Sequence, residues 1–233
     1  MKNQHTNHLI ELLIGTLFIS TSGVLGKFID LPTPVIIWCR SALGGLFLYL
    51  FCRYRKFDIK IKSKKDFSTI LLSAVLLGTH WITYFYALKM SNVALGMLSL
   101  FTFPVITALL EPLFIKTKLN IIHVFLGIIV LIGIYILAPK FDFESSQVKG
   151  ILLGLFSALC YALRNLTLKR HIAQYSGTAL MMHQILILSV LLIPFMLTMD
   201  ISNITTQYPY VILLALITTA IGHSMFIHSL KYF

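Results

Sequence analysis

Charged residues are scarce in this sequence. Asp, Glu, Lys and Arg make up 12% of the 233 residues, about half of the roughly 25% typical of soluble globular domains. The polar segments are also short, so no part of the chain has the composition of a separate water-soluble domain. The composition therefore excludes an ordinary soluble globular protein.

Residues and motifs that bind metals or cofactors are sparse as well. Cys39, Cys52 and Cys160 lie in or at the edge of apolar runs and form no Cys-x-x-Cys pair, so neither a disulfide framework nor a zinc site is predicted. No two histidines stand four residues apart, and no nucleotide-binding loop, His-Glu-x-x-His or Gly-x-Ser-x-Gly motif occurs. We therefore expect no metal, no cofactor and no enzymatic activity.

Long apolar runs are what the sequence has instead. Hydrophobic residues make up 58% of the chain, and the mean hydropathy is +0.87. About twenty helical residues cross the roughly 30 Å hydrocarbon layer of a bilayer, and eight runs of about that length follow one another. The sequence predicts an all-α, polytopic membrane protein with spans at about residues 9–29, 34–52, 67–88, 92–115, 119–138, 149–169, 178–198 and 208–230.

The net charge of +11 is concentrated in particular loops, which does not favour a nucleic-acid partner. With the N-terminus in the cytoplasm, only Lys27, Lys89, Lys140 and Lys149 fall outside, and the positive-inside rule favours this orientation in the cytoplasmic membrane. We expect the 53–65 loop to set the orientation and to touch anionic headgroups. The basic residues expected inside are Lys2, Arg53, Arg55, Lys56, Lys60, Lys62, Lys64, Lys65, Lys116, Lys118, Lys169, Arg170 and Lys231.

Two parts of the chain look alike. Residues 77–89 and 219–231 each place a polar, small-residue stretch before an aromatic segment that ends in small-Leu-Lys. We therefore predict a first repeat at 1–138, a loop at 139–148 and a second repeat at 149–233. Five spans precede the second repeat, so the halves are inverted in the membrane, as in many secondary transporters.

The ordered motifs resemble those of EamA-type members of the drug/metabolite transporter superfamily. The resemblance covers essentially the whole chain, and it implies a ten-helix fold of five plus five inverted helices. The motifs that carry it are Gly15, Trp38-Cys39-Arg40, Tyr84-Phe85-Tyr86-Ala87-Leu88, Phe103-Pro104-Val105, Gly127 and Gly133.

Two features depart from that family. Lys116-Thr117 stands where the family commonly has Gly-Glu, while an acid occurs earlier, in Glu111-Pro112. The sequence ends at Lys231-Tyr232-Phe233, directly after the eighth span, so counterparts of the last two helices are missing. We expect truncation rather than an eight-helix variant, and poorer transport than by a ten-span version.

Ionisable residues within apolar runs are candidates for the transport pathway, because charge in hydrocarbon is costly. Arg40 either binds a substrate carboxylate or extends to the interface. Glu111 either takes part in proton coupling or caps a helix beside Pro112. For Glu11, Lys27 and Arg164 we predict interfacial anchoring.

Three histidines lie within spans. His80, His183 and His223 either relay protons or form neutral hydrogen bonds between helices. Trp81 is a candidate substrate-facing ring. The prolines within spans, which distort helices and are candidate gating points, are Pro104, Pro112 and Pro194.

These observations favour a secondary active transporter, an exporter or permease, of a small metabolite, amino-acid-like compound or drug. Its expected partners are the substrate, the lipid bilayer and a coupling proton or ion, and the sequence leaves a homodimer open. A non-transporting structural or regulatory subunit, or an inactive fragment, is the alternative. An intramembrane enzyme is less favoured.

Overall fold

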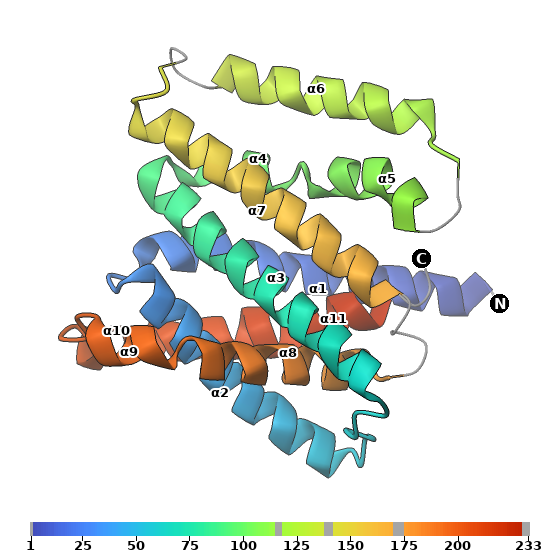
Figure 1. Cartoon of the computed structure of the whole chain (residues 1–233), viewed down its shortest axis with the longest axis vertical. Coiled ribbons are helices and arrows are strands. Elements are labelled where there is room, and N and C mark those ends of the chain that lie inside the picture. Colours follow the sequence, from blue (N-terminus) through green and yellow to red (C-terminus); the bar gives the residue numbers. More distant parts are fainter. Residues whose placement is uncertain (1, 115–117, 138–141, 170–174, 230–233) are drawn as a thin grey trace. The chain divides into compact units, whose positions relative to one another are not determined.

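The computed structural model describes residues 2–114, 118–137, 142–169 and 175–229, and all of the regular structure there is helical (Figure 1). Lys116-Thr117, Lys140, Arg170 and the segment 230–233 lie outside the described residues. The elements are α1 (Lys2–Phe28), α2 (Thr33–Tyr54), α3 (Lys64–Met90), α4 (Val93–Leu100), α5 (Phe103–Phe114), α6 (Ile121–Leu137), α7 (Ser146–Lys169), α8 (Gly177–Leu191), α9 (Ile193–Thr198), α10 (Ile204–Leu213), the π-helix η1 (Leu214–Gly222) and α11 (His223–Ser229).

The helices confirm a polytopic helical membrane protein. Within the described residues, six helical stretches are long and apolar enough to cross a bilayer, and Ile121–Leu137 and Gly177–Leu191 are shorter apolar helices. Together these eight segments coincide with the eight predicted spans. They also reach beyond them in places, because α1, α3 and α7 begin several residues before the apolar runs.

Two predicted spans are interrupted. The fourth divides into α4 and α5 just before Pro104, and the seventh divides at Leu192, just before Pro194 in the first turn of α9. Proline lacks the donor for the preceding turn and is tolerated at a helix start, which accounts for both breaks. Pro112 instead lies inside α5, and the helix continues past it to Phe114.

The chain forms two compact units, Met1–Ala74 with Leu168–Phe233 as unit 1 and Val75–Thr167 as unit 2. The boundaries of these units differ from those of the predicted repeats, because unit 1 contains helices from both ends of the sequence. The repeat boundaries at 138 and 149 remain a prediction.

In unit 1, α2 packs against α8 and η1, and α1 packs against η1 and α11 (Figure 1). Small residues permit the close approach of α1: a Cβ added at Gly15 would lie 3.3 Å from the backbone oxygen of Gly222 and 3.1 Å from Cβ of Met225. The first helix and the last described helix are therefore almost in backbone contact.

In unit 2, α6 packs against α4 and α5. Leu95, Ile134 and Ile151 form a buried cluster there. The outer face of α6 is apolar, with Ile121, Phe125 and Ile136 well exposed, as expected for a face in contact with hydrocarbon.

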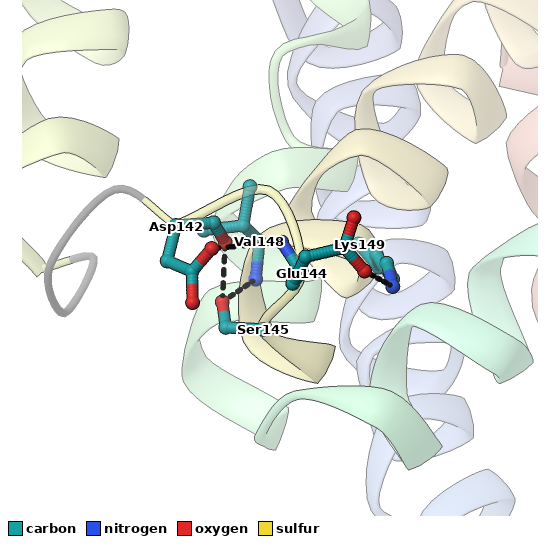
Figure 2. A network of polar contacts seen from close by, with 5 residues as sticks. All are labelled: Asp142, Glu144, Ser145, Val148 and Lys149. Atoms are coloured by element: carbon teal, nitrogen blue, oxygen red, sulfur yellow. Dashed lines mark hydrogen bonds and ion pairs between the residues drawn. The ribbon is translucent and has the colours of Figure 1, made fainter.

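Polar side chains organise the turn that begins α7 (Figure 2). Ser145 Oγ donates to the Asp142 carbonyl oxygen (2.8 Å) and accepts from the Val148 backbone nitrogen (3.2 Å). Lys149 Nζ lies 2.9 Å from Glu144 Oε2. Ser145 therefore acts as the side-chain cap of the first turn of α7.

Candidate functional site

Arg40 lies buried in the interior of unit 1. Its side chain is 0% exposed. Nε donates to Thr219 Oγ1 (3.0 Å), Nη2 to Thr218 Oγ1 (3.1 Å) and Nη1 to Ser22 Oγ (3.4 Å). One guanidinium thus joins α1, α2 and η1, and its hydrogen bonds offset the large penalty of burying a charge.

The π-helix explains how two adjacent threonines reach the same guanidinium. A π-helix holds more residues per turn than an α-helix, so neighbouring side chains are separated by less than the roughly 100° of an α-helix. The hydroxyls of Thr218 and Thr219 donate to the Leu214 carbonyl oxygen at 2.7 and 3.3 Å. Their lone pairs are thereby left to accept from Arg40.

A cavity of about 500 Å³ lies within unit 1, and most of its lining is apolar. The ionisable residues among those that line it are Glu11 and His228. The lining residues are Glu11, Phe47, Leu48, Phe51, Phe57, Thr178, Leu216, Ala220, Ile221, Ser224, Met225 and His228.

Glu11 and His228 are in direct contact. His228 Nδ1 lies 2.9 Å from Glu11 Oε1, and His8 Nδ1 lies 3.6 Å from Glu11 Oε2. The Glu11 side chain is 27% exposed and that of His228 is 41% exposed. The close packing of α1 on α11 brings the pair together, so Glu11 has a specific partner beyond the interfacial anchoring predicted for it.

The other predicted histidines of unit 1 have different surroundings. His183 Nε2 lies 2.9 Å from the Ile59 carbonyl oxygen, so it tethers the loop between α2 and α3. His223 is buried at the start of α11. Neither is among the residues that line the cavity.

Tyr175 holds the same loop from a position just before α8. Its hydroxyl donates to Asp66 Oδ2 (2.8 Å) and accepts from the Lys62 backbone nitrogen (3.0 Å). Burial, and then the contacts with Asp66, raise the pKa of the Tyr175 hydroxyl. The hydroxyl therefore stays protonated and remains able to donate to Asp66 at neutral pH.

In unit 2, His80 is a buried histidine that bonds to another helix. Nδ1 lies 2.7 Å from Ser157 Oγ and 3.2 Å from the Ser157 carbonyl oxygen, while Ser157 Oγ donates to the His80 carbonyl oxygen. The Ser157 carbonyl oxygen can only accept a hydrogen bond, and the Ser157 hydroxyl proton is already donated to the His80 carbonyl oxygen. We therefore assign the His80 ring proton to Nδ1. The imidazole also stacks on Tyr161, with ring centroids 4.5 Å apart.

Arg164 is buried beside Tyr161, whereas interfacial anchoring is the sequence-based prediction for it. Its side chain is 0% exposed. Nη1 donates to Asn165 Oδ1 (3.0 Å), and the guanidinium carbon lies 5.7 Å from the centroid of the Tyr161 ring, within the range of a cation–π interaction. The neighbouring Trp81 is also buried.

The predicted pathway residues thus fall in two units. Arg40, His183 and His223 belong to unit 1, whereas His80, Trp81 and Glu111 belong to unit 2. Glu111 is partly buried in α5, and Pro104 and Pro194 are exposed. Among the described residues, no three His, Cys, Asp or Glu side chains gather closely enough to hold a metal ion.

Sequence reasoning missed His228. It lies at the end of an apolar run, as Glu11 lies at the start of another, and that shared position was the available signal. The pairing itself depends on contact between the first and last described helices, and its two residues are 217 positions apart in the sequence.

Comparison with known proteins matches this chain to a transporter family and to individual transporters. Residues 8–138 and 148–233 match the EamA-like transporter family. The uncharacterized transporter YxxF of Bacillus subtilis (strain 168) is 24% identical over 98% of this chain and 75% of its own length. The pseudopaline exporter CntI of Pseudomonas aeruginosa is 23% identical over 71% of this chain, and the match spans 57% of the exporter.

A solved crystal structure has the same fold. It aligns with a TM-score of 0.73 at 16% identity, over 97% of this chain and 79% of the other. At that identity the likeness concerns the fold alone.

Proposed function

Because the chain belongs to the EamA-like transporter family, we propose that it is a secondary active transporter that moves a small metabolite by alternating access. It is a multi-pass membrane protein, and its named relatives are transporters. We also propose that residues 1–138 and 149–233 act as inverted repeats, that the chain resides in the cytoplasmic membrane and that a proton or other ion drives transport.

The cavity of unit 1 is the observation that carries this proposal. A volume of about 500 Å³ is within the usual range for small-molecule sites, which are mostly apolar with a few polar groups that fix orientation. Glu11 and His228 are such groups. Ionisable side chains within membrane spans commonly mark substrate and ion pathways.

Arg40 supports the site from the interior of the bundle. Its three hydroxyl partners hold α1, α2 and η1 at fixed spacing, and these same helices contribute residues to the cavity lining. Its direct contact with substrate, and the pathway roles of His80, Trp81, Glu111, His183 and His223, remain predictions. So does gating at Pro104, Pro112 and Pro194.

Transport is tested directly in proteoliposomes. The purified chain is reconstituted in vesicles loaded with a ¹³C-labelled whole-cell metabolite extract, and efflux is followed by mass spectrometry with and without a pH gradient. We expect efflux of particular metabolites that saturates with their concentration and falls when a protonophore collapses the gradient.

Protein-free vesicles provide the control for leakage. Efflux equal to that control for every metabolite, under gradients of either direction, contradicts transport by this chain. Efflux that is saturable but indifferent to the protonophore contradicts proton coupling alone.

A further inference from the structure

The connection between α2 and α3 forms an ordered basic surface in unit 1, the basic strap (residues 55–63). We propose that the basic strap is a binding site for the phosphate groups of anionic phospholipids such as phosphatidylglycerol. The inference is independent of the proposed function. It also goes beyond the headgroup contact expected from the sequence, because it rests on the way the protein holds the strap in place.

The basic strap has an inner apolar side and an outer polar side. Phe57, Ile59 and Ile61 are partly buried, and Ile61 packs against a core cluster that includes Ile70 and Leu168. The intervening positions 58, 60 and 62 are exposed. This alternation is that of an extended chain, so the charged side chains lie on the side that faces away from the core.

Polar contacts hold the basic strap against α8 and the residues just before it. His183 Nε2 lies 2.9 Å from the Ile59 carbonyl oxygen, and the Lys62 backbone nitrogen donates to the Tyr175 hydroxyl oxygen (3.0 Å). Lys62 Nζ also lies 5.4 Å from the centroid of the Tyr175 ring. A surface that is ordered before binding loses less conformational entropy when a ligand binds to it.

The exposed charge of this region is strongly positive. Asp66 is only 8% exposed, and its Oδ2 accepts a hydrogen bond from the Tyr175 hydroxyl (2.8 Å). Asp58 is exposed, and its Oδ1 accepts from the Lys60 backbone nitrogen (3.0 Å). The exposed cations between the last turn of α2 and the first turn of α3 are Arg53, Arg55, Lys56, Lys60, Lys62, Lys64 and Lys65.

Lys56 occupies a backbone position that favours glycine. Its φ of 55° is left-handed. The Phe57 nitrogen donates to the Cys52 carbonyl oxygen (3.0 Å) and the Lys56 nitrogen to that of Arg53 (3.2 Å), which is the hydrogen-bond pattern of a Schellman cap. Glycine is the usual residue at this position, because a Cβ strains a left-handed backbone. A lysine held there points to a function for its side chain.

The position of the basic strap favours a lipid over a soluble anion. The strap joins Thr33–Tyr54 and Lys64–Met90, two helices that are long and apolar enough to cross a bilayer, so both of its ends lie at a membrane surface. Tyr54, the last residue of α2, is 82% exposed, as is common where tyrosines meet headgroups. Basic side chains at this level are attracted to the phosphates of anionic lipids.

Native mass spectrometry of the purified full chain in detergent tests the inference. The probes are dioctanoyl-phosphatidylglycerol and dioctanoyl-phosphatidylcholine, which have the same acyl chains but differ in net charge. We expect phosphatidylglycerol to bind at least about tenfold more tightly, and this difference to shrink as the ionic strength rises. Glycerol phosphate is the soluble-anion probe, and it should compete only at concentrations at least about tenfold above that of the lipid.

Matched substitutions locate the site. Arg55→Gln combined with Lys60→Gln should weaken binding of phosphatidylglycerol by at least about fivefold and leave phosphatidylcholine unaffected. Lys118→Gln removes an exposed cation from a different loop and should change neither affinity. Tyr175→Phe should weaken phosphatidylglycerol by about threefold, although it removes no cation, because the strap loses the hydrogen bonds that order it.

Lys56→Gly separates binding from folding. Glycine relieves the strain of the left-handed backbone, so the thermal unfolding midpoint should rise. The affinity for phosphatidylglycerol should nevertheless fall, because a cation is lost from the site. A purely structural role of the strap predicts the higher midpoint without the loss of affinity.

Several results would overturn the inference. Equal affinity for the two lipids, or competition by glycerol phosphate at the same concentration as the lipid, contradicts an anionic-phospholipid site. A loss in Lys118→Gln as large as in the double variant indicates diffuse attraction to net charge, and unchanged affinity in Lys56→Gly or Tyr175→Phe contradicts a site of fixed geometry. None of these measurements involves transport, so the proposed function is tested separately.

Discussion

Arg40 and Arg164 show two ways of burying a positive charge in the described part of a membrane protein. Arg40 directs three donors to hydroxyl oxygens of three different residues, and Arg164 combines an amide oxygen with the face of Tyr161. In both, a planar group with several fixed donors suits the surroundings. Lysine has only one nitrogen and cannot reproduce either arrangement.

We expect Arg40→Lys to destabilise the protein by about 1–3 kcal/mol, because an ammonium group cannot reach Ser22, Thr218 and Thr219 together. Thermal unfolding of the solubilised chain measures the effect. Arg53→Lys, at an exposed position near the end of α2, is the matched control. A shift no larger than that of the control would contradict the cross-linking role of Arg40.

At this scale the sequence predicted the residue types better than their partners. Arg40 and His80 are candidates from the sequence because an ionisable side chain within a membrane span is energetically costly and commonly has a function. Arg40 is buried, and its role in substrate binding stays a prediction. The partners Thr218 and Thr219 could not be predicted, because they depend on the π-helical register of η1.

Among the helices, the contact of α1 with η1 and α11 positions Glu11 against His228. It depends on two glycines that face each other, Gly15 and Gly222. Gly133 of α6 provides a contrast, because a Cβ added there meets nothing within 4 Å.

We expect Gly15→Ala to destabilise the protein by about 1–3 kcal/mol, because the added methyl group would force α1 away from Met225 and the backbone of Gly222. Gly133→Ala should be neutral or stabilising by up to about 1 kcal/mol, since alanine is the better helix former. Thermal unfolding of both variants distinguishes these outcomes, and equal shifts would contradict the close packing of α1.

The positions of the helices were predictable because hydrophobic length specifies them directly. The breaks before Pro104 and Pro194 follow from proline chemistry and were anticipated as distortions. The π-helix was not anticipated, because no residue type in Leu214–Gly222 marks it. Helix neighbours such as α1 and α11 also escape sequence reasoning, since eight apolar runs can pack in many ways.

For the whole molecule, the inverted arrangement predicts the side of the membrane on which each loop lies. If the halves are inverted and the N-terminus is cytoplasmic, the loop that contains Lys60 lies in the cytoplasm and the loop that contains Glu144 lies on the opposite side. Both side chains are exposed, so each can be labelled.

We expect Lys60→Cys to react with a membrane-impermeant maleimide only from the cytoplasmic side, and Glu144→Cys only from the outside. The background variant lacks Cys39, Cys52 and Cys160, which are free and buried. Labelling of both sites from one side would contradict the inverted arrangement and with it the alternating-access proposal.

The meeting of Gly15 with Gly222 limits how the membrane can deform unit 1. Main-chain atoms of the two helices lie close together there, so van der Waals repulsion between them sets a minimum distance between the helices. Lateral pressure from a thicker or stiffer bilayer can tilt the helices about this point, but it cannot squeeze them closer together.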